Sequence, residues 1–252
     1  MKPNHSTFVL RVCAVLVLFI PALFPALTRA ANITWGSQQQ ITGNNDVSMN
    51  GVLIGAFNVG DTGVPSTTVN GVVFQSFAAP GGTGMSGNFT MTPGGGGVFN
   101  SNTAGGSTMP PFSNLSPEYQ TLLSSYVTPV FSPVTLTISG LMIGTQYQFQ
   151  FWSNLSSQRF GYQITATGGS NSITLSCNTG GAEGGLGQFV SGFFTADATN
   201  QNISFLGDGD GGFLNAFQLR QIPEPKTSLL LVAALVGGGL FQVCRRIKPA
   251  KT

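Results

Sequence analysis

The chain has 252 residues, ten of them Lys or Arg and eight Asp or Glu, so charged residues make up only 7%, against about 25% in ordinary soluble domains. The formal net charge of +2 is unevenly divided, because residues 31–222 hold two cations and seven carboxylates, which gives that part a net charge of −5. Nucleic-acid binding is excluded for this part, since phosphate contacts need clustered Lys and Arg.

The N-terminal segment has the three parts of a secretory signal peptide. Lys2 and Arg11 are basic, residues 12–20 form a short apolar run, and Thr28-x-Ala30 is a small-residue cleavage pattern. A transmembrane anchor is the alternative, but this run is too short to span a bilayer comfortably before Pro21. We therefore expect signal peptidase to remove residues 1–30, cutting after Ala30 or Ala31.

The first half of the exported part, up to residue 129, is irregular. Residues 33–35, 52–57 and 69–77 are predicted strands, the last with a turn at Asn70–Gly71. Residues 80–109 are rich in Gly, Ser and Thr and poor in apolar residues, which predicts a long surface excursion or flexible flap. Residues 117–123 predict one short helix, capped by Ser116 ahead of Pro117.

The second half alternates apolar and polar residues with a period of two. Residues 134–138 and 147–151 show it most clearly, and glycine-rich turns separate the later strands. We expect Gln146, Gln148 and Gln150 to lie on a solvent face. The fold class is therefore all-β: residues 31–221 form a single β-sandwich between a signal peptide and a C-terminal transmembrane helix.

Two segments resemble a known kind of sandwich. Gly140–Leu141, Gly144 and Tyr147, between two alternating strands, resemble an element of jelly-roll carbohydrate-binding modules with a galactose-binding-like fold. Residues 187–196, ahead of a strand ending at Leu219, are similar to the last strands of such modules. Fibronectin type III domains carry a comparable pattern, but the length favours the jelly roll over a module of about 100 residues. The resemblance covers residues 130–220, implies a jelly-roll-like fold and fixes no binding residue.

The C-terminus combines three features in a fixed order. Pro223–Glu224–Pro225 comes first, residues 227–244 are uncharged, and Arg245–Arg246 follow. At about 1.5 Å per residue the uncharged run spans roughly 27 Å as a helix, enough for the hydrocarbon core. The cations after it would stay in the cytoplasm, which leaves residues 31–222 outside.

This tail, residues 222–248, closely resembles the PEP-CTERM sorting signal of Gram-negative bacteria. The resemblance implies export across the inner membrane and recognition by an exosortase, a membrane-embedded cysteine transpeptidase-like enzyme, with a cut at or near Pro223–Glu224–Pro225. Proteins with this tail usually come from bacteria that make exopolysaccharide, and they end at the cell surface or in the extracellular matrix. This chain continues past the Arg pair to Thr252, where many members stop sooner. The alternative is a permanent single-pass anchor in which Pro223–Glu224–Pro225 is merely a linker.

Two ligand sites are candidates within the exported part. Asp208 and Asp210 lie on a glycine-rich turn and would offer calcium two carboxylates, although the rest of an EF-hand loop is absent and a plain surface turn is the alternative. Trp152 has the opposite parity to Phe149 and Phe151, so an outward Trp152 could stack on sugar, with Asn154 and Arg159 as hydrogen-bonding partners. A core tryptophan is the alternative. Trp35 and Tyr126 are the other aromatic candidates.

Catalysis has little support in the sequence. The single histidine, His5, lies in the leader, and Cys177 is the one cysteine between residues 31 and 222. This part of the chain therefore lacks the residues for a Ser or Cys nucleophile activated by histidine and for the usual His and Cys ligand sets of zinc. Glu118 and Glu183, with Asp208 or Asp210, could be nominated as a glycosidase pair, but nothing distinguishes them from solvent-exposed acids.

We therefore expect a non-enzymatic exported protein with a structural or adhesive role, one that could bind exopolysaccharide, with no required cofactor. Its expected partners are signal peptidase, an exosortase, the inner membrane transiently and a polysaccharide. The alternatives are a secreted polysaccharide-active enzyme and a permanently anchored surface protein.

Overall fold

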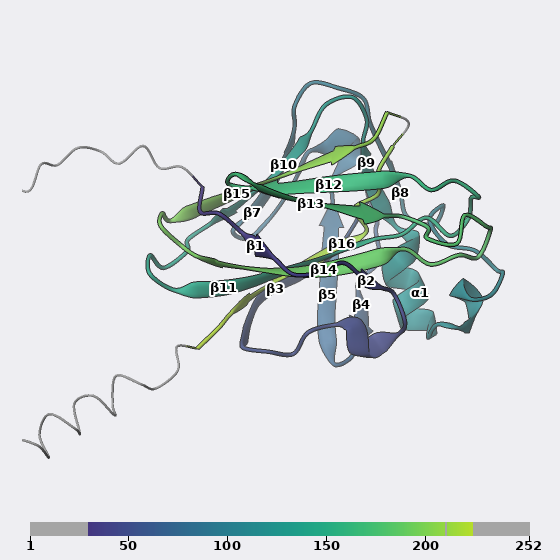
Figure 1. Ribbon diagram of the computed structural model, residues 1–252, viewed down its shortest axis with the longest axis horizontal. Coiled ribbons are helices and arrows are strands. Elements are labelled where there is room, and N and C mark those ends of the chain that lie inside the picture. Colours follow the sequence, from purple (N-terminus) through teal and green to yellow (C-terminus); the bar gives the residue numbers. More distant parts are fainter. Residues whose placement is uncertain (1–29, 210, 224–252) are drawn as a thin grey trace, which may run out of the picture.

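The computed structural model describes residues 30–209 and 211–223, and most of the strands in them form two large β-sheets packed face to face (Figure 1). The signal peptide, Asp210, Glu224–Pro225, the uncharged run and Arg245–Arg246 lie outside the described residues. No helix among the described residues is long and apolar enough to cross a membrane. The two-sheet sandwich predicted from the alternating strands is confirmed.

The first sheet has eight strands in the order β1-β14-β11-β16-β3-β5-β4, with β2 also paired to β14. Pairing is antiparallel except between β3 and β5, which run parallel. Its strands are β1 (Thr34–Trp35), β2 (Gln39–Gln40), β3 (Val52–Gly60), β4 (Thr67–Val69), β5 (Val72–Ala78), β11 (Gln146–Ser153), β14 (Gln188–Thr195) and β16 (Ala216–Gln221).

The second sheet has six antiparallel strands in the order β13-β12-β15-β10-β7-β6, and β8 pairs with β9 as a separate two-stranded sheet. The second-sheet strands are β6 (Gly84–Ser86), β7 (Phe89–Pro93), β10 (Val134–Ser139), β12 (Gln163–Gly168), β13 (Asn171–Ser176) and β15 (Asn200–Gly207). The pair is β8 (Val98–Ser101) and β9 (Tyr126–Pro129), and the helical elements are α1 (Pro117–Ser124), η1 (Asn44–Asp46), η2 (Pro80–Gly82) and η3 (Phe112–Asn114).

Local sequence signals explain several of these elements. Val134, Leu136 and Ile138 of β10 are buried and alternate with partly exposed Thr135 and Thr137, as the period of two predicts. Asn70 and Gly71, both with positive φ, make the tight turn that joins β4 to β5. The predicted helix is α1, whose Ser116 side chain accepts a hydrogen bond from the Tyr119 backbone N–H at 3.3 Å.

The prediction of a surface excursion over residues 80–109 is wrong. This segment contains β6, β7 and β8, and β7 pairs with β10 inside the second sheet. Phe89 and Met91 of β7 are buried in the main core. The few scattered apolar residues among many Gly, Ser and Thr are too weak a signal for strands, although Phe89 and Met91 suffice because neighbouring strands supply the rest of the core.

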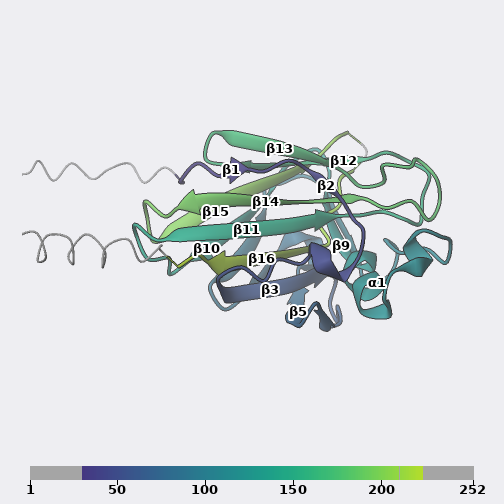
Figure 2. The ribbon, with the colours of Figure 1, turned by 60° about the horizontal axis from the view of Figure 1, so that its bottom comes forward.

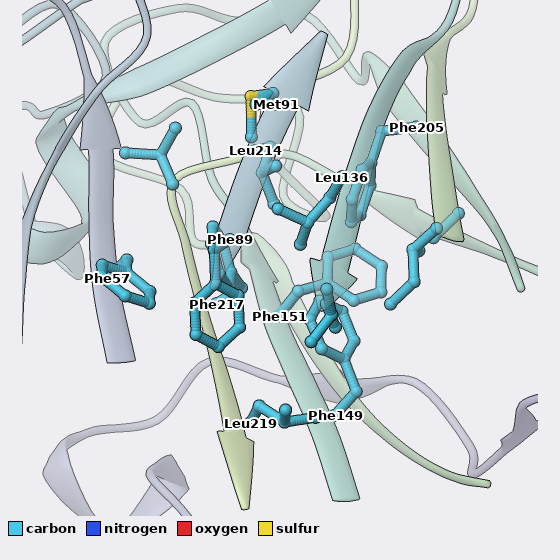
Figure 3. Close-up of a cluster of buried hydrophobic side chains, with 14 of the residues drawn as sticks. Phe57, Phe89, Met91, Leu136, Phe149, Phe151, Phe205, Leu214, Phe217 and Leu219 are labelled. Atoms are coloured by element: carbon cyan, nitrogen blue, oxygen red, sulfur yellow. The ribbon is translucent and has the colours of Figure 1, made fainter. Parts of the chain in front are cut away.

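The main core lies between the two sheets and is unusually aromatic. Figure 3 shows Phe57, Phe149, Phe151 and Phe217 of the first sheet pointing toward Phe89, Leu136 and Phe205 of the second. Phe151 and Phe205 meet edge to face across the sandwich, with ring centroids 5.3 Å apart. This packing holds the two sheets together.

The outer face of the first sheet is also covered, which the sequence pattern does not reveal. Helix α1 and the segment 41–47 pack on it and enclose a second apolar cluster that includes Phe74, Tyr119 and Trp152. Beside that cluster Gln148 and Gln150 are buried, with Ser48 donating hydrogen bonds to both side-chain oxygens. The expected solvent face of β11 is therefore wrong for these two glutamines, whereas Gln146 is exposed.

Candidate functional site

The two ends of the described chain lie at the same end of the sandwich, here called the exit end (Figures 1 and 2). Ile222 donates its backbone N–H to the Gln146 carbonyl at 2.9 Å. A hollow of about 620 Å³ lined by Ala31, Gln146 and Asp197 places the N-terminal end of the described chain at the same end as Gln146, the hydrogen-bonding partner of Ile222. The opposite end, where α1 lies, is called the distal end.

Trp152 has the predicted parity, and of the two alternatives for its side chain, an outward binding position or a core position, the structure shows the core position. Its side chain points away from the main core, yet it is fully buried in the second cluster between Phe74 and Phe189. The indole nitrogen donates a hydrogen bond to the Tyr119 hydroxyl at 2.9 Å. Because α1 covers this face, Trp152 cannot stack on a sugar, and the core alternative is correct.

Asn154 is likewise fully buried and holds backbone in place. Its carboxamide oxygen accepts hydrogen bonds from the Gly187 backbone N–H and the Ser156 hydroxyl, both at 3.0 Å, and its nitrogen donates to two carbonyls. With its hydrogen-bonding groups engaged in this way, Asn154 is not available to a ligand.

Arg159 is exposed at the distal end, where it precedes a row of aromatic side chains. This distal aromatic row consists of Tyr126, Phe160, Tyr162 and Phe213. Phe160 lies 5.5 Å from Tyr162, Tyr162 lies 5.9 Å from Phe213, and Phe213 meets Tyr126 edge to face at 4.6 Å, between ring centroids. The row therefore continues unbroken from an exposed ring to rings that pack on the interior.

The distal aromatic row combines one buried ring, which anchors it to the interior, with three rings that solvent can reach. Phe213 is buried with Leu155 and Cys177, whereas Tyr126 and Tyr162 are half-buried and pack against that cluster, and Phe160 is exposed. Burial raises the pKa of Tyr126, so its hydroxyl stays a neutral hydrogen-bond donor at physiological pH. Rings held by neighbouring rings lose little side-chain entropy on binding, and a flat apolar face suits a sugar ring.

Sequence reasoning named Tyr126 and Arg159 but missed the row as a unit. Tyr126 begins β9, Tyr162 immediately precedes β12, and Phe213 lies shortly before β16. Each lies at or shortly before the start of a different strand, and only the sheet topology brings these starts together. The sequence feature that could have indicated the row is an aromatic residue at or shortly before the start of each of three strands. All three strands begin at the distal end.

Trp35 closes an edge of the main core rather than offering a binding surface. It is partly buried, packs edge to face on Phe151 at 5.8 Å, and donates its indole N–H to the Asn171 carbonyl at 3.2 Å. We therefore assign it a packing role.

Asp208 stabilises a turn between β15 and the chain leading to β16. Its side chain accepts a hydrogen bond from the Gln163 backbone N–H at 3.0 Å, and its carbonyl accepts one from Gly211 at 2.6 Å. Asp210, its proposed calcium-binding partner, lies outside the described residues. In residues 30–209 and 211–223, no three His, Cys, Asp or Glu side chains gather as they would around a metal ion.

The nucleophile and acid candidates are placed in different settings. Glu118 is exposed on the first turn of α1, and Glu183 is exposed in the turn after β13. Cys177 is fully buried beside the Ser153 hydroxyl, and burial raises the pKa of its thiol to about 12. The thiol therefore stays protonated at neutral pH, as expected of a small buried hydrophobe.

No family model matches this chain, and no curated protein matches it either. Among solved structures it is similar to an exo-β-1,3-galactanase from Phanerochaete chrysosporium with galactose, at 15% identity and a TM-score of 0.29, over 54% of this chain and 30% of that one. It is also similar to the enzymatically active domain of bacteriophage CBA120 tailspike protein 4, at 14% identity and a TM-score of 0.31, over 60% and 23%. The chain thus spans less than a third of either protein.

A further similarity is to a structure of carbohydrate-binding modules from the β-sandwich superfamily, at 12% identity and a TM-score of 0.17, over 75% of this chain and 98% of that one. These TM-scores are too low to support a fold assignment, so the assignment of a β-sandwich depends on the strand pairing observed in this chain.

Proposed function

We propose that this chain is an exported protein whose jelly-roll-like β-sandwich binds polysaccharide without catalysis, at the cell surface or in the extracellular matrix. The signal peptide directs residues 31–221 across the inner membrane, and the predicted span at residues 227–244 holds them there briefly. An exosortase then cuts at or near Pro223–Glu224–Pro225. These steps follow from the resemblance of residues 222–248 to PEP-CTERM sorting signals.

One geometric observation supports the binding role most directly: the distal aromatic row lies at the opposite end of the sandwich from the residues where the chain enters and leaves. Strand β12 starts next to Tyr162 and ends at Gly168, whose carbonyl accepts a hydrogen bond from Ile33 near the N-terminal end. Six strand residues separate the two ends by about 20 Å. A chain tethered at the exit end would therefore present the row away from the membrane.

The chemistry of the row favours a neutral or weakly acidic polysaccharide. Tyr126, Phe160 and Tyr162 offer apolar ring faces, which suit the C–H faces of sugars, and the two tyrosine hydroxyls offer hydrogen bonds. Arg159, the one exposed cation among the described residues, adjoins Phe160 and could pair with a uronate or another acidic substituent.

The binding proposal is tested with the mature protein from culture medium, titrated with the producing organism's exopolysaccharide. Tyr162→Ala should weaken binding about tenfold, equivalent to roughly 1.4 kcal/mol. Met85→Ala is the matched control, because Met85 is exposed on the edge strand β6 and its loss should leave binding unchanged. Equal affinity of wild type and Tyr162→Ala would refute the site.

The enzyme alternative has its own outcome. Shortening of the polysaccharide by the wild-type protein, abolished by Glu118→Gln or Glu183→Gln, would replace the non-catalytic proposal with a glycosidase.

A further inference from the structure

Several apolar side chains are exposed at the exit end, and five of them form what we call the exit rim. They are Met49, Val52, Ile54, Met142 and Ile143, with exposed fractions of 53%, 59%, 41%, 52% and 65%. Met49 lies in the loop before β3, Val52 is the first residue of β3, and Met142 and Ile143 lie in the turn between β10 and β11. Exposed apolar side chains are ordinary when scattered, but a group gathered on one end of a domain marks a contact surface.

The exit rim surrounds the strand from which the chain continues. Ile222 is hydrogen-bonded to Gln146, just after the Met142–Ile143 turn, and its neighbour Gln221 pairs with Val52. Gly51 packs so closely on Gln221 and Ile222 that a Cβ there would lie 2.2 Å from the Gln221 carbonyl oxygen. The rim residues therefore lie on both sides of the path by which the chain leaves the domain.

This end of the domain also carries few exposed charges. Asp197, in the turn after β14, is exposed there, whereas Arg220 is buried and donates hydrogen bonds to the carbonyls of Met49, Asn50 and Gly51. The other described carboxylates of the loops, such as Glu183 and Asp208, belong to the distal end. Contact with a low-dielectric surface at the exit end would therefore desolvate few charged groups.

The length of the following chain limits where this end can be. Pro223, the last described residue, is four residues from Thr227, where the uncharged run begins, and four residues extend over at most about 14 Å. The polar headgroup layer is itself about 6 Å thick on each side of the bilayer. If residues 227–244 span the membrane, Pro223 lies within about 14 Å of the start of the span, and the exit rim next to Pro223 is therefore held close to the headgroup layer.

We infer that the exit rim rests in the headgroup layer of a phospholipid bilayer while the chain is still attached to its predicted span. This inference depends on the membrane-held intermediate of the proposed function and adds the surface by which the domain contacts the lipid. The contact is intramolecular once the span is inserted, so five apolar side chains suffice to maintain it. It would hold Pro223 at the membrane surface, within reach of a membrane-embedded processing enzyme.

The test uses residues 31–252, the chain expected after removal of the signal peptide, reconstituted into vesicles of phosphatidylcholine and phosphatidylglycerol, with Cys244 replaced by Ser. Ile143→Cys carries a polarity-sensitive fluorophore, and Phe99→Cys is the matched control, since Phe99 is also 65% exposed but lies on β8 toward the distal end (Figure 1). Cys177 is buried and does not compete for the label. A nitroxide attached to the lipid headgroups should quench the label at residue 143 at least twofold more than the label at residue 99.

The same fluorophore is attached in a second variant, Met49→Cys, on the other side of Ile222. Quenching there would show that the result at residue 143 does not reflect a change confined to the Met142–Ile143 turn. Equal quenching at residues 49, 99 and 143 in chains that float with the vesicles would overturn the lipid contact and leave the predicted span intact. Chains that fail to float at all would overturn both the contact and the membrane-held intermediate.

Discussion

Trp152 donates its indole N–H to the hydroxyl of Tyr119 at 2.9 Å, and that hydroxyl donates in turn to the Asp46 carboxylate at 3.0 Å. Asp46 also accepts hydrogen bonds from the backbone of Thr42 and Gly43. A strand, a helix and an N-terminal loop are thereby joined on the outer face of the first sheet. Burial, reinforced by the Asp46 carboxylate, holds the pKa of Tyr119 well above its usual range, so the hydroxyl remains a donor.

Replacing Trp152 should therefore affect stability rather than binding. Trp152→Ala is expected to lower the free energy of unfolding by about 3–5 kcal/mol, because it leaves a cavity and removes the hydrogen bond that the Tyr119 hydroxyl accepts. Chemical denaturation monitored by circular dichroism measures this change, with Met85→Ala as an exposed control. A folded Trp152→Ala protein of unchanged stability that no longer binds polysaccharide would contradict the assignment.

Arg220 should be essential for the order of the loop that precedes β3. It is 5% exposed and donates to the carbonyls of Met49, Asn50 and Gly51 and to the side-chain oxygen of Gln218. Arg220→Met leaves these acceptors without a donor and should cost about 2–3 kcal/mol. Hydrogen exchange should speed up first in residues 47–51.

Arg220→Lys serves as the companion variant. A lysine ammonium cannot reproduce the planar fork of the guanidinium, so we expect incomplete rescue. Full protection of residues 47–51 in Arg220→Met would show that these hydrogen bonds do not hold the loop.

These assignments show what the sequence could predict. Strand β10, the Asn70–Gly71 turn and the Ser116-capped helix follow from short-range patterns, because alternation, turn propensity and capping act within a few residues. The period of two also separates the Trp152 face from the Phe151 face. It cannot tell whether the second face is covered, since the covering segments, residues 41–51 and α1, are distant in the chain.

The candidate site was less predictable for the same reason. The distal aromatic row joins residues 160 and 162, which are close in the chain, to residues 126 and 213, and nothing local marks these distant residues as neighbours. Gln148 and Gln150 illustrate the converse: polar side chains become interior when a loop supplies Ser48 as a hydrogen-bond donor. Long-range topology, not residue type, decided both outcomes.

Cys177 should make stability depend on alkaline pH. The thiol of an unfolded chain ionises near its ordinary pKa of 9.0, whereas burial raises the folded pKa to about 12. Between these values the unfolded state releases a proton that the folded state retains. The contribution of the protonated Cys177 thiol to the free energy of unfolding is therefore fully present below pH 9. It is lost as the pH rises toward 12, by up to about 1.4 kcal/mol per pH unit.

Urea denaturation between pH 8 and 11 measures this dependence. Cys177→Ala is the control, and its stability should fall less steeply than that of the wild type over this range. Tyr119 shifts in the same direction in both proteins, so the difference between the two curves isolates the thiol. Parallel curves would mean that the Cys177 thiolate is tolerated inside the fold.

Calcium should not be needed for folding. The Asp208 carboxylate already accepts a hydrogen bond from the Gln163 backbone, which is the role of a turn-stabilising side chain. We expect the melting temperature in millimolar CaCl₂ to match that in EDTA within about 1 °C, whereas occupancy at 100 times Kd would add about 2.7 kcal/mol. A calcium-dependent rise that disappears in Asp208→Asn would restore the metal site.

The central claim is that the chain is an acidic, exported β-sandwich whose N-terminal signal peptide and C-terminal sorting signal are both removed by proteolysis. Mass spectrometry of the intact surface or matrix protein tests it most directly. The account predicts an N-terminus at or next to Ala31 and a C-terminus at or near Pro223, so the mature chain lacks all cations of both ends. A surface form that still contains Arg245–Arg246 would contradict the account and identify a permanently anchored protein.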